Sequence, residues 1–238
     1  MSADPLDQAL SDYWQGDPSA TVYLRSPFAG EQALPIAYFF RDPDEFPLQE
    51  WTAISLCRGR VLDIGAGSGC HSLVLQQQGY AVWALDHSAV AVQILQERGV
   101  QQVVLADIFH FQPPLPFETL LLLMNGIGLV KTLSGLQQFL QLAHDWLLPN
   151  GQILLDSTDL RDPPDGDEES LPDPNSADFH EVVFEVEYQG KAGDPLPWLF
   201  IAPERLSQVA AQTDWFCQVV YQDEEGSYLA RLTSTRAG

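Results

Sequence analysis

The sequence predicts an α/β fold: a Rossmann-like doubly wound sheet, mostly parallel and seven-stranded, closed by a C-terminal antiparallel hairpin. Three observations lead to this prediction. Short apolar strand-like segments alternate with helical ones through the middle of the chain, a glycine-rich turn follows the first of these strands, and two alternating segments joined by a polar turn close the sequence. With 238 residues, 45% of them hydrophobic, the chain is long enough for one such domain with a large core.

Five central strands are expected at residues 60–64, 81–86, 103–107, 119–124 and 152–156. They are nearly all apolar, as in a sheet covered on both faces. Helices are expected over residues 68–78, from Ser88 as the N-cap to Gly99 as the stop, and from Ser134 to about Leu147, where an apolar stripe recurs at steps of three and four. Residues 149–151 (PNG) are predicted to turn the chain into the fifth strand.

The flanking regions predict additions to this core. Residues 21–25 and 36–40 are expected to form a hairpin, followed by a helix over 48–57, and residues 180–188 and 198–201 an inserted strand pair. Pro203 starts a helix to about residue 213, and residues 216–221 and 228–232 form the closing hairpin. Residues 159–178 are acidic and rich in proline, which favours a surface loop, with a lid over the site as the alternative.

We therefore expect a single domain over residues 1–238. Its parts are an N-terminal extension (1–55), a cofactor-binding core (56–158), the acidic loop with the inserted strand pair (159–202), and a C-terminal helix with the hairpin (203–238).

The charge balance restricts the partners. There are 33 acidic and 11 basic residues, a formal net charge of −22, and such a surface repels phosphate groups. We expect no nucleic-acid or membrane partner; the charge either favours a neutral or cationic small-molecule substrate or serves solubility. No apolar run approaches the roughly 18 residues of a membrane span, the N-terminus does not read as a signal peptide, and the three cysteines form no pair, so a cytoplasmic location with reduced thiols is expected.

A glycine turn follows the first strand, with glycines at positions 65, 67 and 69. Such a turn lets the backbone approach a ligand without Cβ interference. Dinucleotide dehydrogenases use a similar turn, but their fingerprint places the third glycine where Cys70 stands. Asp63 lies just before the turn, and a carboxylate there suits a ligand with an ammonium and a sulfonium better than a pyrophosphate. The turn therefore favours a sulfonium ligand over a dinucleotide.

Two further acids end the next two strands. Asp86 lies about twenty residues past Gly65, where a carboxylate can accept hydrogen bonds from ribose hydroxyls, and Asp107 ends the third strand. The carboxyl ends of parallel strands share one edge of a sheet, and ligands bind at that edge. We expect the acids at positions 63, 86 and 107 to surround one ligand.

The motifs together resemble those of a known family. Residues 61–69 (VLDIGAGSG) resemble the glycine motif of class I S-adenosylmethionine-dependent methyltransferases, residues 84–88 (ALDHS) their ribose-binding acidic motif, residues 106–108 (ADI) their adenine-binding position, and residues 147–152 (LLPNGQ) their turn before the fifth strand. The resemblance implies S-adenosylmethionine as cofactor and S-adenosylhomocysteine as product. The cofactor-binding residues that it implies are Asp63, Gly65, Ala66, Gly67, Gly69, Asp86, His87, Asp107, Ile108 and Asn125.

The expected reaction is methyl transfer to a small-molecule acceptor by in-line displacement. Because the methyl group is already activated, positioning supplies much of the rate, and a base is needed only for a protonated nucleophile. Two catalytic candidates follow strands: Asn125, placed near the methyl group by the resemblance, and Asp156 at the end of the fifth strand. The Asn/Asp-Pro-Pro-Tyr/Phe signature is absent, which argues against a DNA or protein-glutamine target, and no histidine spacing indicates a metal.

Two other functions stay open at this point: a nicotinamide-dependent Rossmann oxidoreductase and a non-catalytic cofactor-binding module. Neither Lys131 nor Lys191 follows a tyrosine by four residues, which disfavours the first. His71, early in the first helix, is interpreted as a packing residue. Aromatic residues outside the core pattern either cage an apolar or cationic substrate or pack the N-terminal extension. They are Tyr13, Trp14, Tyr38, Phe39, Phe40 and Trp198. The oligomeric state is left open.

Overall fold

The computed structural model describes residues 4–27, 30–160 and 181–236. The acidic segment predicted as a loop or lid lies outside the described residues, apart from positions 159 and 160. None of the helices in these ranges is long and apolar enough to cross a lipid bilayer.

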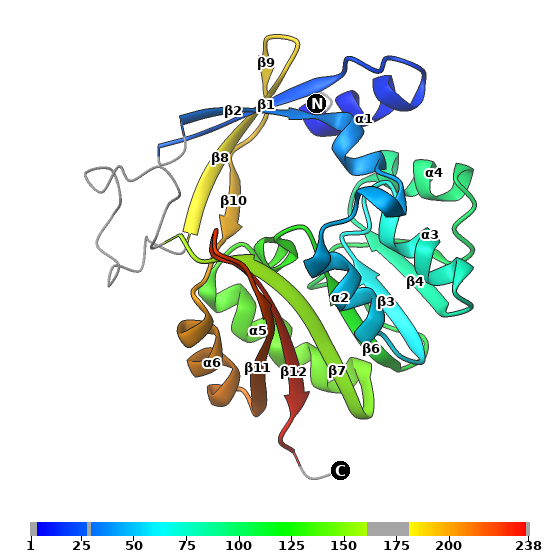
Figure 1. Ribbon diagram of the computed structural model, residues 1–238. Helices are drawn as coiled ribbons and strands as arrows, with labels where there is room; N and C mark the ends of the chain where they lie inside the picture. Colours follow the sequence, from blue (N-terminus) through cyan, green and yellow to red (C-terminus); the bar gives the residue numbers. More distant parts are fainter. Residues whose placement is uncertain (1–3, 28–29, 161–180, 237–238) are drawn as a thin grey trace.

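The central sheet has seven strands in the order β11-β12-β7-β6-β3-β4-β5 (Figure 1). Its parallel part consists of β3 (Arg60–Ile64), β4 (Ala81–Asp86), β5 (Val103–Leu105), β6 (Phe117–Leu122) and β7 (Leu147–Thr158). The hairpin of β11 (Trp215–Gln222) and β12 (Ser227–Ser234) adds to β7 in antiparallel orientation. The predicted fold class is confirmed.

Helices cover both faces of this sheet (Figure 1). On one face lie α2 (Leu48–Leu56), α3 (Cys70–Gln77) and α4 (Ala89–Glu97), and on the other α5 (Leu133–Trp146) and α6 (Pro203–Gln212). Ser88 caps α4 as predicted, since its Oγ accepts from the Ala91 amide at 3.0 Å. This cap fixes the start of α4 directly after the carboxyl end of β4.

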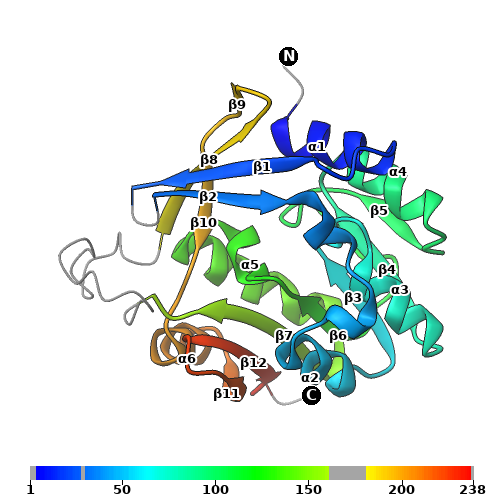
Figure 2. The same cartoon turned by 45° about the horizontal axis from the view of Figure 1, so that its top comes forward.

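A second, smaller sheet joins segments that are far apart in the sequence. Its order is β10-β8-β1-β2, with β9 paired to β8. The strands are β1 (Thr21–Ser26), β2 (Gly30–Pro35), β8 (Glu181–Tyr188), β9 (Lys191–Ala192) and β10 (Leu196–Leu199). The two inserted strands pair with each other as predicted, but β8 also pairs with β1, so the insertion and the N-terminal extension share one sheet. Figure 2 shows β1, β8 and β9 near α1 (Pro5–Trp14), while β10 leads toward α6.

Two predicted details are wrong. Residues 36–40 were expected as a strand, but they form the 3-10 helix η1 (Ile36–Phe40), and β2 is the partner of β1. Ile36 still donates its amide to Ala20 O, but its side chain is completely buried beside α1, and the chain coils into η1 from this residue. The predicted start of the fifth strand is also wrong: β7 already begins at Leu147, and residues 149–151 form an irregularity within it, with Asn150 at φ 64° where the register with β6 shifts. Four elements were not predicted at all: α1, η2 (Pro43–Glu45), η3 (Gly126–Val130) and β9.

Candidate functional site

A pocket lies at the carboxyl edge of the central sheet. One wall comes from the ends of β3, β4 and β5, and the other from η3 (Gly126–Val130) with the residue after it, and from β10 of the second sheet. The lining residues are Ile64, Gly65, Leu85, Asp86, His87, Ala106, Asp107, Ile108, Gly128, Leu129, Lys131, Leu196, Pro197 and Trp198. Five of the predicted cofactor-binding residues are therefore gathered around one pocket, those at positions 65, 86, 87, 107 and 108.

The glycine turn forms the floor of the pocket beside β3. The amides of Gly65 and Ala66 donate to Leu85 O at 2.8 and 3.1 Å, which ties the turn to β4. Gly65 has φ 73°, and a Cβ there would overlap the side chain of Leu129. The backbone conformation therefore favours glycine, and a Cβ would in addition force the tip of the Leu129 side chain to move. Ala66, Gly67 and Gly69 shape the turn without lining the pocket.

Asp86 is fixed by the backbone on both sides of it. One carboxylate oxygen accepts from the Gly67 amide at 2.8 Å and the other from the Ser88 amide at 2.9 Å. The residue is 7% exposed but lines the pocket. An ionised carboxylate offers about four acceptor sites, so each oxygen has one left for a hydroxyl of a ligand. His87 lies beside it, with Nδ1 3.6 Å from Asp86 Oδ1 and an exposed side chain.

Asp107 and Ile108 form the far end of the pocket. Asp107 Oδ1 accepts from the Phe109 amide at 2.8 Å and lies 3.2 Å from His110 Nδ1. Ile108 is 8% exposed, and with Ala106 it adds an apolar wall next to this carboxylate. An acid beside an apolar surface suits a flat base that carries an amino group.

Asp63 lies behind the glycine turn and does not line the pocket. It is 2% exposed, and its Oδ2 accepts from Ser72 Oγ at 2.6 Å. Burial raises the pKa of Asp63, and the nearby His71 and the hydrogen bond from Ser72 only partly offset this effect. Its negative charge is thus poorly compensated, so a cation bound above the turn would be favoured.

Asp156 and Asn125, the two catalytic candidates, shape the loop after β6. Asp156 is 3% exposed and accepts from the amides of Met124 and Gly126, at 3.0 and 2.8 Å, and from Gln49 Nε2 at 2.9 Å. Burial raises the pKa of Asp156 to about 6. Met124 and Asn125 both have positive φ, at 66° and 55°, and the carboxylate bridges the amides on either side of Asn125.

The side chain of Asn125 is held away from the pocket. Its Oδ1 accepts from Thr158 Oγ1 at 2.9 Å, while its backbone oxygen accepts from Trp198 Nε1 at 3.1 Å. Neither Asn125 nor Asp156 lines the pocket, which differs from the placement that the sequence suggested. Both belong to, or contact, the loop that leads into η3, whose residues Gly128 and Leu129 line the pocket.

The six aromatic residues outside the core pattern divide into two groups. Trp198 lines the pocket. Tyr13 and Trp14 instead pack on Phe40, with ring centroids 4.7 and 5.9 Å apart, and Tyr38 meets Phe39 edge-on at 6.2 Å. These five residues therefore pack within the N-terminal extension, which is the second of the two roles that the sequence left open for them.

Sequence reasoning missed a buried ionic network beneath the site. Glu50 of α2 accepts from Arg41 Nη2 at 2.9 Å, and its other oxygen lies 2.7 Å from His71 Nε2 at the start of α3. Burial raises the pKa of Glu50, but its hydrogen bonds to His71 and Arg41 outweigh this and leave the pKa below its usual value. The network ties the N-terminal segment to the helix of the glycine turn. No spacing in the sequence links these three residues, so no motif could have indicated them.

Other lining residues were missed because they come from η3 and the second sheet: Leu129, Lys131, Leu196 and Pro197. Residues 198–201 were recognised as a strand paired with residues 180–188, but the pairing of β8 with β1 was not. Among the described residues, no group of three or more His, Cys, Asp or Glu side chains has the arrangement of a metal site.

Known proteins resemble this chain in sequence and in structure. The family described as "Methyltransferase domain" matches residues 62–155. The structure of an S-adenosylmethionine-dependent methyltransferase from Bacteroides fragilis, in complex with S-adenosyl-L-homocysteine, is 34% identical and superposes with a TM-score of 0.87. That match covers 98% of this chain and 95% of that chain.

More distant structures share the fold alone. The CcbJ methyltransferase from Streptomyces caelestis is 14% identical, with a TM-score of 0.60 over 81% of this chain and 94% of that chain. The sugar N-methyltransferase KedS8 from Streptoalloteichus sp ATCC 53650 is also 14% identical, with a TM-score of 0.57 over 84% of this chain and 92% of that chain. None of the curated proteins compared with the chain matches it.

Proposed function

The chain belongs to the S-adenosylmethionine-dependent methyltransferases, and from that premise we propose that it methylates a neutral or cationic small molecule in the pocket between β3 and β10. It is an enzyme whose cofactor is S-adenosylmethionine. The bound cofactor supplies a methyl carbon activated by a sulfonium, which a nucleophile attacks in line as the carbon–sulfur bond breaks. The protein's own task is to hold the two partners in line and to exclude water.

The observation that carries this assignment is the arrangement of Asp86. Its carboxylate is fixed by the amides of Gly67 and Ser88, and it lines the pocket with one acceptor site left on each oxygen. This arrangement supports Asp86, with His87 beside it, as the group that binds two neighbouring ribose hydroxyls. The glycine turn at Gly65, Ala66, Gly67 and Gly69 then lies where the methionine part of the cofactor would start.

The remaining donor-side residues follow from their surroundings. Asp107 and Ile108 combine a carboxylate with an apolar wall, which supports an adenine site. Asp63 is buried, so its proposed contribution is the field of its carboxylate at the sulfonium and ammonium groups rather than a direct contact.

Asn125 and Asp156 are proposed as positioning residues. Asp156 accepts from the amides of Met124 and Gly126, and the backbone oxygen of Asn125 accepts from Trp198. Together they fix the loop that joins β6 to η3. We call the side of the pocket around Gly65, Asp86 and Asp107 the donor wall. No described side chain is assigned as a general base. This fits an acceptor whose nucleophilic atom is already deprotonated, or one that releases its proton to solvent.

The charge of the chain supports the acceptor class. With a formal net charge of −22, the surface disfavours anionic substrates and nucleic acids at long range and favours neutral or cationic ones. The exclusion of nucleic acids, the cytoplasmic location and the domain boundaries remain predictions from the sequence.

Calorimetric titration with S-adenosylmethionine, S-adenosylhomocysteine and NADH tests the donor assignment. We expect single-site binding of both sulfur compounds and none of NADH, whereas binding of NADH alone would overturn it in favour of the oxidoreductase alternative. Incubation with label in the transferable methyl group and a metabolite extract then tests catalysis. Appearance of a labelled small molecule supports the proposal, and cofactor binding without any transfer would indicate the non-catalytic alternative.

A further inference from the structure

One face of the second sheet is uncharged: its β10 end lines the pocket, and its β1 and β8 part packs against α1. Leu196 and Trp198 of β10 line the pocket, and their cross-strand partners on β8 are Phe184 and Val182. Because side chains alternate along a strand, positions in register with these share their face. The same face continues through Val186 of β8. On β1 and β2 its positions are occupied by Val22, Leu24, Ser26, Gly30, Gln32 and Leu34. None of these strand positions carries a charge.

The opposite face of the same sheet carries the charges. Arg25 of β1 pairs with Glu31 of β2 at 2.6 Å, lies 3.6 Å from Glu185 of β8, and also pairs with Glu187. All four side chains are exposed or partly exposed. The sequence thus separates a charged outer face from an uncharged inner face, although the chain as a whole is strongly acidic.

Trp198 of β10 is held in a fixed orientation where it lines the pocket. Its indole N–H donates to the backbone oxygen of Asn125 at 3.1 Å. Its ring lies directly against Gly128, where a Cβ would overlap the indole. The hydrogen bond and the glycine together immobilise a large flat side chain that is only partly buried and that faces the pocket. A preordered aromatic surface of this kind loses little conformational freedom when a ligand binds.

The position of Trp198 relates it to the acceptor rather than to the donor. Asp86 and Asp107, at the ends of β4 and β5, lie on the side of the pocket proposed for the adenosine part. Trp198 contacts the loop after β6, which is on the other side of β3 in the strand order. The charged residues that line the pocket belong to the donor wall, apart from the exposed Lys131 at the end of η3.

Resting on the proposed methyltransferase function, we propose that Trp198 is the stacking platform for the acceptor, and that the acceptor presents a planar aromatic ring to it. A flat ring gains offset-stacking contacts on the indole that a saturated ring of the same size does not. The uncharged surroundings favour a ring without ionised substituents on the side that meets β10.

Matched probes test this platform. In the presence of saturating S-adenosylhomocysteine, which occupies the donor site without reacting, we measure calorimetric binding of two pairs: 2-naphthol with decahydro-2-naphthol, and phenol with cyclohexanol. We expect the aromatic member of at least one pair to bind the wild type about fivefold more tightly than its saturated partner. Trp198→Leu should remove this preference, and Trp198→Phe should retain part of it.

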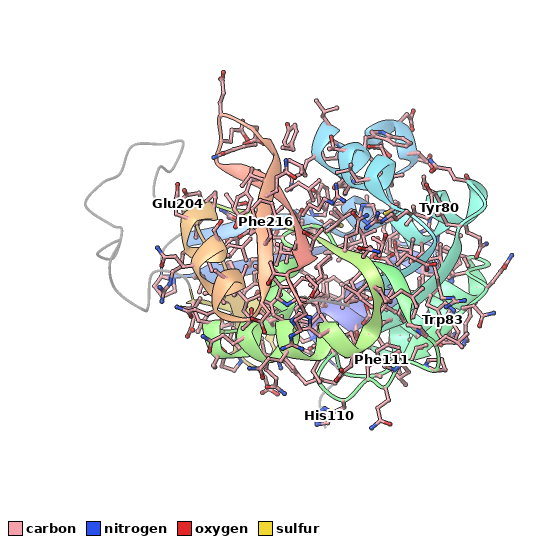
Figure 3. The ribbon with its side chains drawn as sticks, turned by 90° about the horizontal axis from the view of Figure 1, so that it is seen from below. Tyr80, Trp83, His110, Phe111, Glu204 and Phe216 are labelled. Atoms are coloured by element: carbon pink, nitrogen blue, oxygen red, sulfur yellow. The ribbon has the colours of Figure 1, made fainter. Side chains whose placement is uncertain are left out.

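The control variant is Phe216→Leu. Phe216 is 59% exposed on β11, the outer edge strand of the central sheet, and is labelled in Figure 3. It should leave both the affinity for the donor product and the aromatic preference unchanged. If Trp198→Leu does not fold, as judged by its melting curve, the test rests on Trp198→Phe, whose preference must fall below that of the wild type.

Three results would overturn the proposal that Trp198 is a stacking platform. They are equal affinities within both pairs, no binding of any probe, and a full aromatic preference in both Trp198 variants. Weaker binding of S-adenosylhomocysteine to Trp198→Leu would also overturn it, because the indole would then belong to the donor site. Failure of the wild type to bind S-adenosylhomocysteine is a different result, which contradicts the proposed function itself.

Discussion

The two walls of the pocket are built in opposite ways. The donor wall comes from three short pieces of sequence around Gly65, Asp86 and Asp107, each a strand followed closely by a turn. The wall that carries Trp198 depends on pairing between β1 and β8, which are more than a hundred residues apart in the chain. The first wall holds carboxylates, whereas the second holds none, and its only charged lining residue among those described is Lys131. Local sequence therefore specifies the residues proposed to bind the donor, whereas long-range strand pairing positions those proposed to bind the acceptor.

The largest expected loss of stability comes from removing the Asp156 carboxylate, which holds the loop between β6 and η3. Asp156→Ala leaves the amides of Met124 and Gly126 and the side chain of Gln49 without their buried acceptor. We expect the free energy of unfolding to fall by about 4 kcal/mol, because several buried donors lose their partner together. Urea denaturation measures it, with the exposed Asp145→Ala as control, expected within about 0.5 kcal/mol of the wild type. A loss below about 1 kcal/mol would show that the loop does not depend on Asp156.

The same residue makes the stability depend on pH. Burial raises the pKa of Asp156 from 3.8 to about 6, so the folded state holds this proton more tightly than the unfolded state does. Its contribution to stability is complete below pH 3.8 and is lost as the pH rises through about 6. In parallel urea titrations from pH 4 to 8, the unfolding free energy of the wild type relative to Asp156→Asn should fall by up to about 3 kcal/mol. A difference independent of pH would contradict the raised pKa.

A change in the donor wall should weaken cofactor binding, in addition to the stability that is lost when the amides of Gly67 and Ser88 lose their acceptor. Asp86→Ala removes the carboxylate proposed to accept from the ribose, and we expect about a thirtyfold weaker affinity for S-adenosylhomocysteine, roughly 2 kcal/mol. Calorimetry measures this affinity, and Trp198→Leu serves as the matched change in the other wall, with an unchanged value. An affinity for Asp86→Ala within threefold of the wild type would show that the ribose assignment is wrong.

The smallest effect concerns the contact between the donor wall and the N-terminal helix. Ser88 caps α4 and also donates its hydroxyl to Asp7 of α1. Ser88→Ala should lower the free energy of unfolding by about 1 kcal/mol, the usual cost of a lost cap. Thermal and urea unfolding measure it. An unchanged stability would indicate that the cap and the contact with α1 contribute nothing to the fold.

The contrast between the walls also explains what the sequence could predict. The strands at residues 60–64 and 81–86, the cap at Ser88 and the closing hairpin follow from local patterns, and the structure has all of them. Gly65, Asp86, His87, Asp107 and Ile108 line one pocket because parallel strands end at a common edge. Their contacts with the cofactor stay predictions.

The other features of the fold and site depend on contacts between segments far apart in the chain, which local sequence patterns do not indicate. The apolar run Ile36–Phe40 has strand propensity, but Ile36 enters the core beside α1 and the chain coils into η1. Alternation marked residues 180–188 as a strand without indicating that β1 lies next to it. Asp156 was expected at the pocket because it ends a strand, and only the conformation of the following loop shows its carboxylate bound to two backbone amides.

The most direct test of the two-wall account is a crystal structure with S-adenosylhomocysteine bound. We expect the ribose hydroxyls on the carboxylate of Asp86, the adenine beside Ile108, and the sulfur directed toward the gap between Gly65 and the indole of Trp198. A ribose bound elsewhere, or a sulfur atom facing away from Trp198, would contradict the division of this pocket into a donor wall and an acceptor wall.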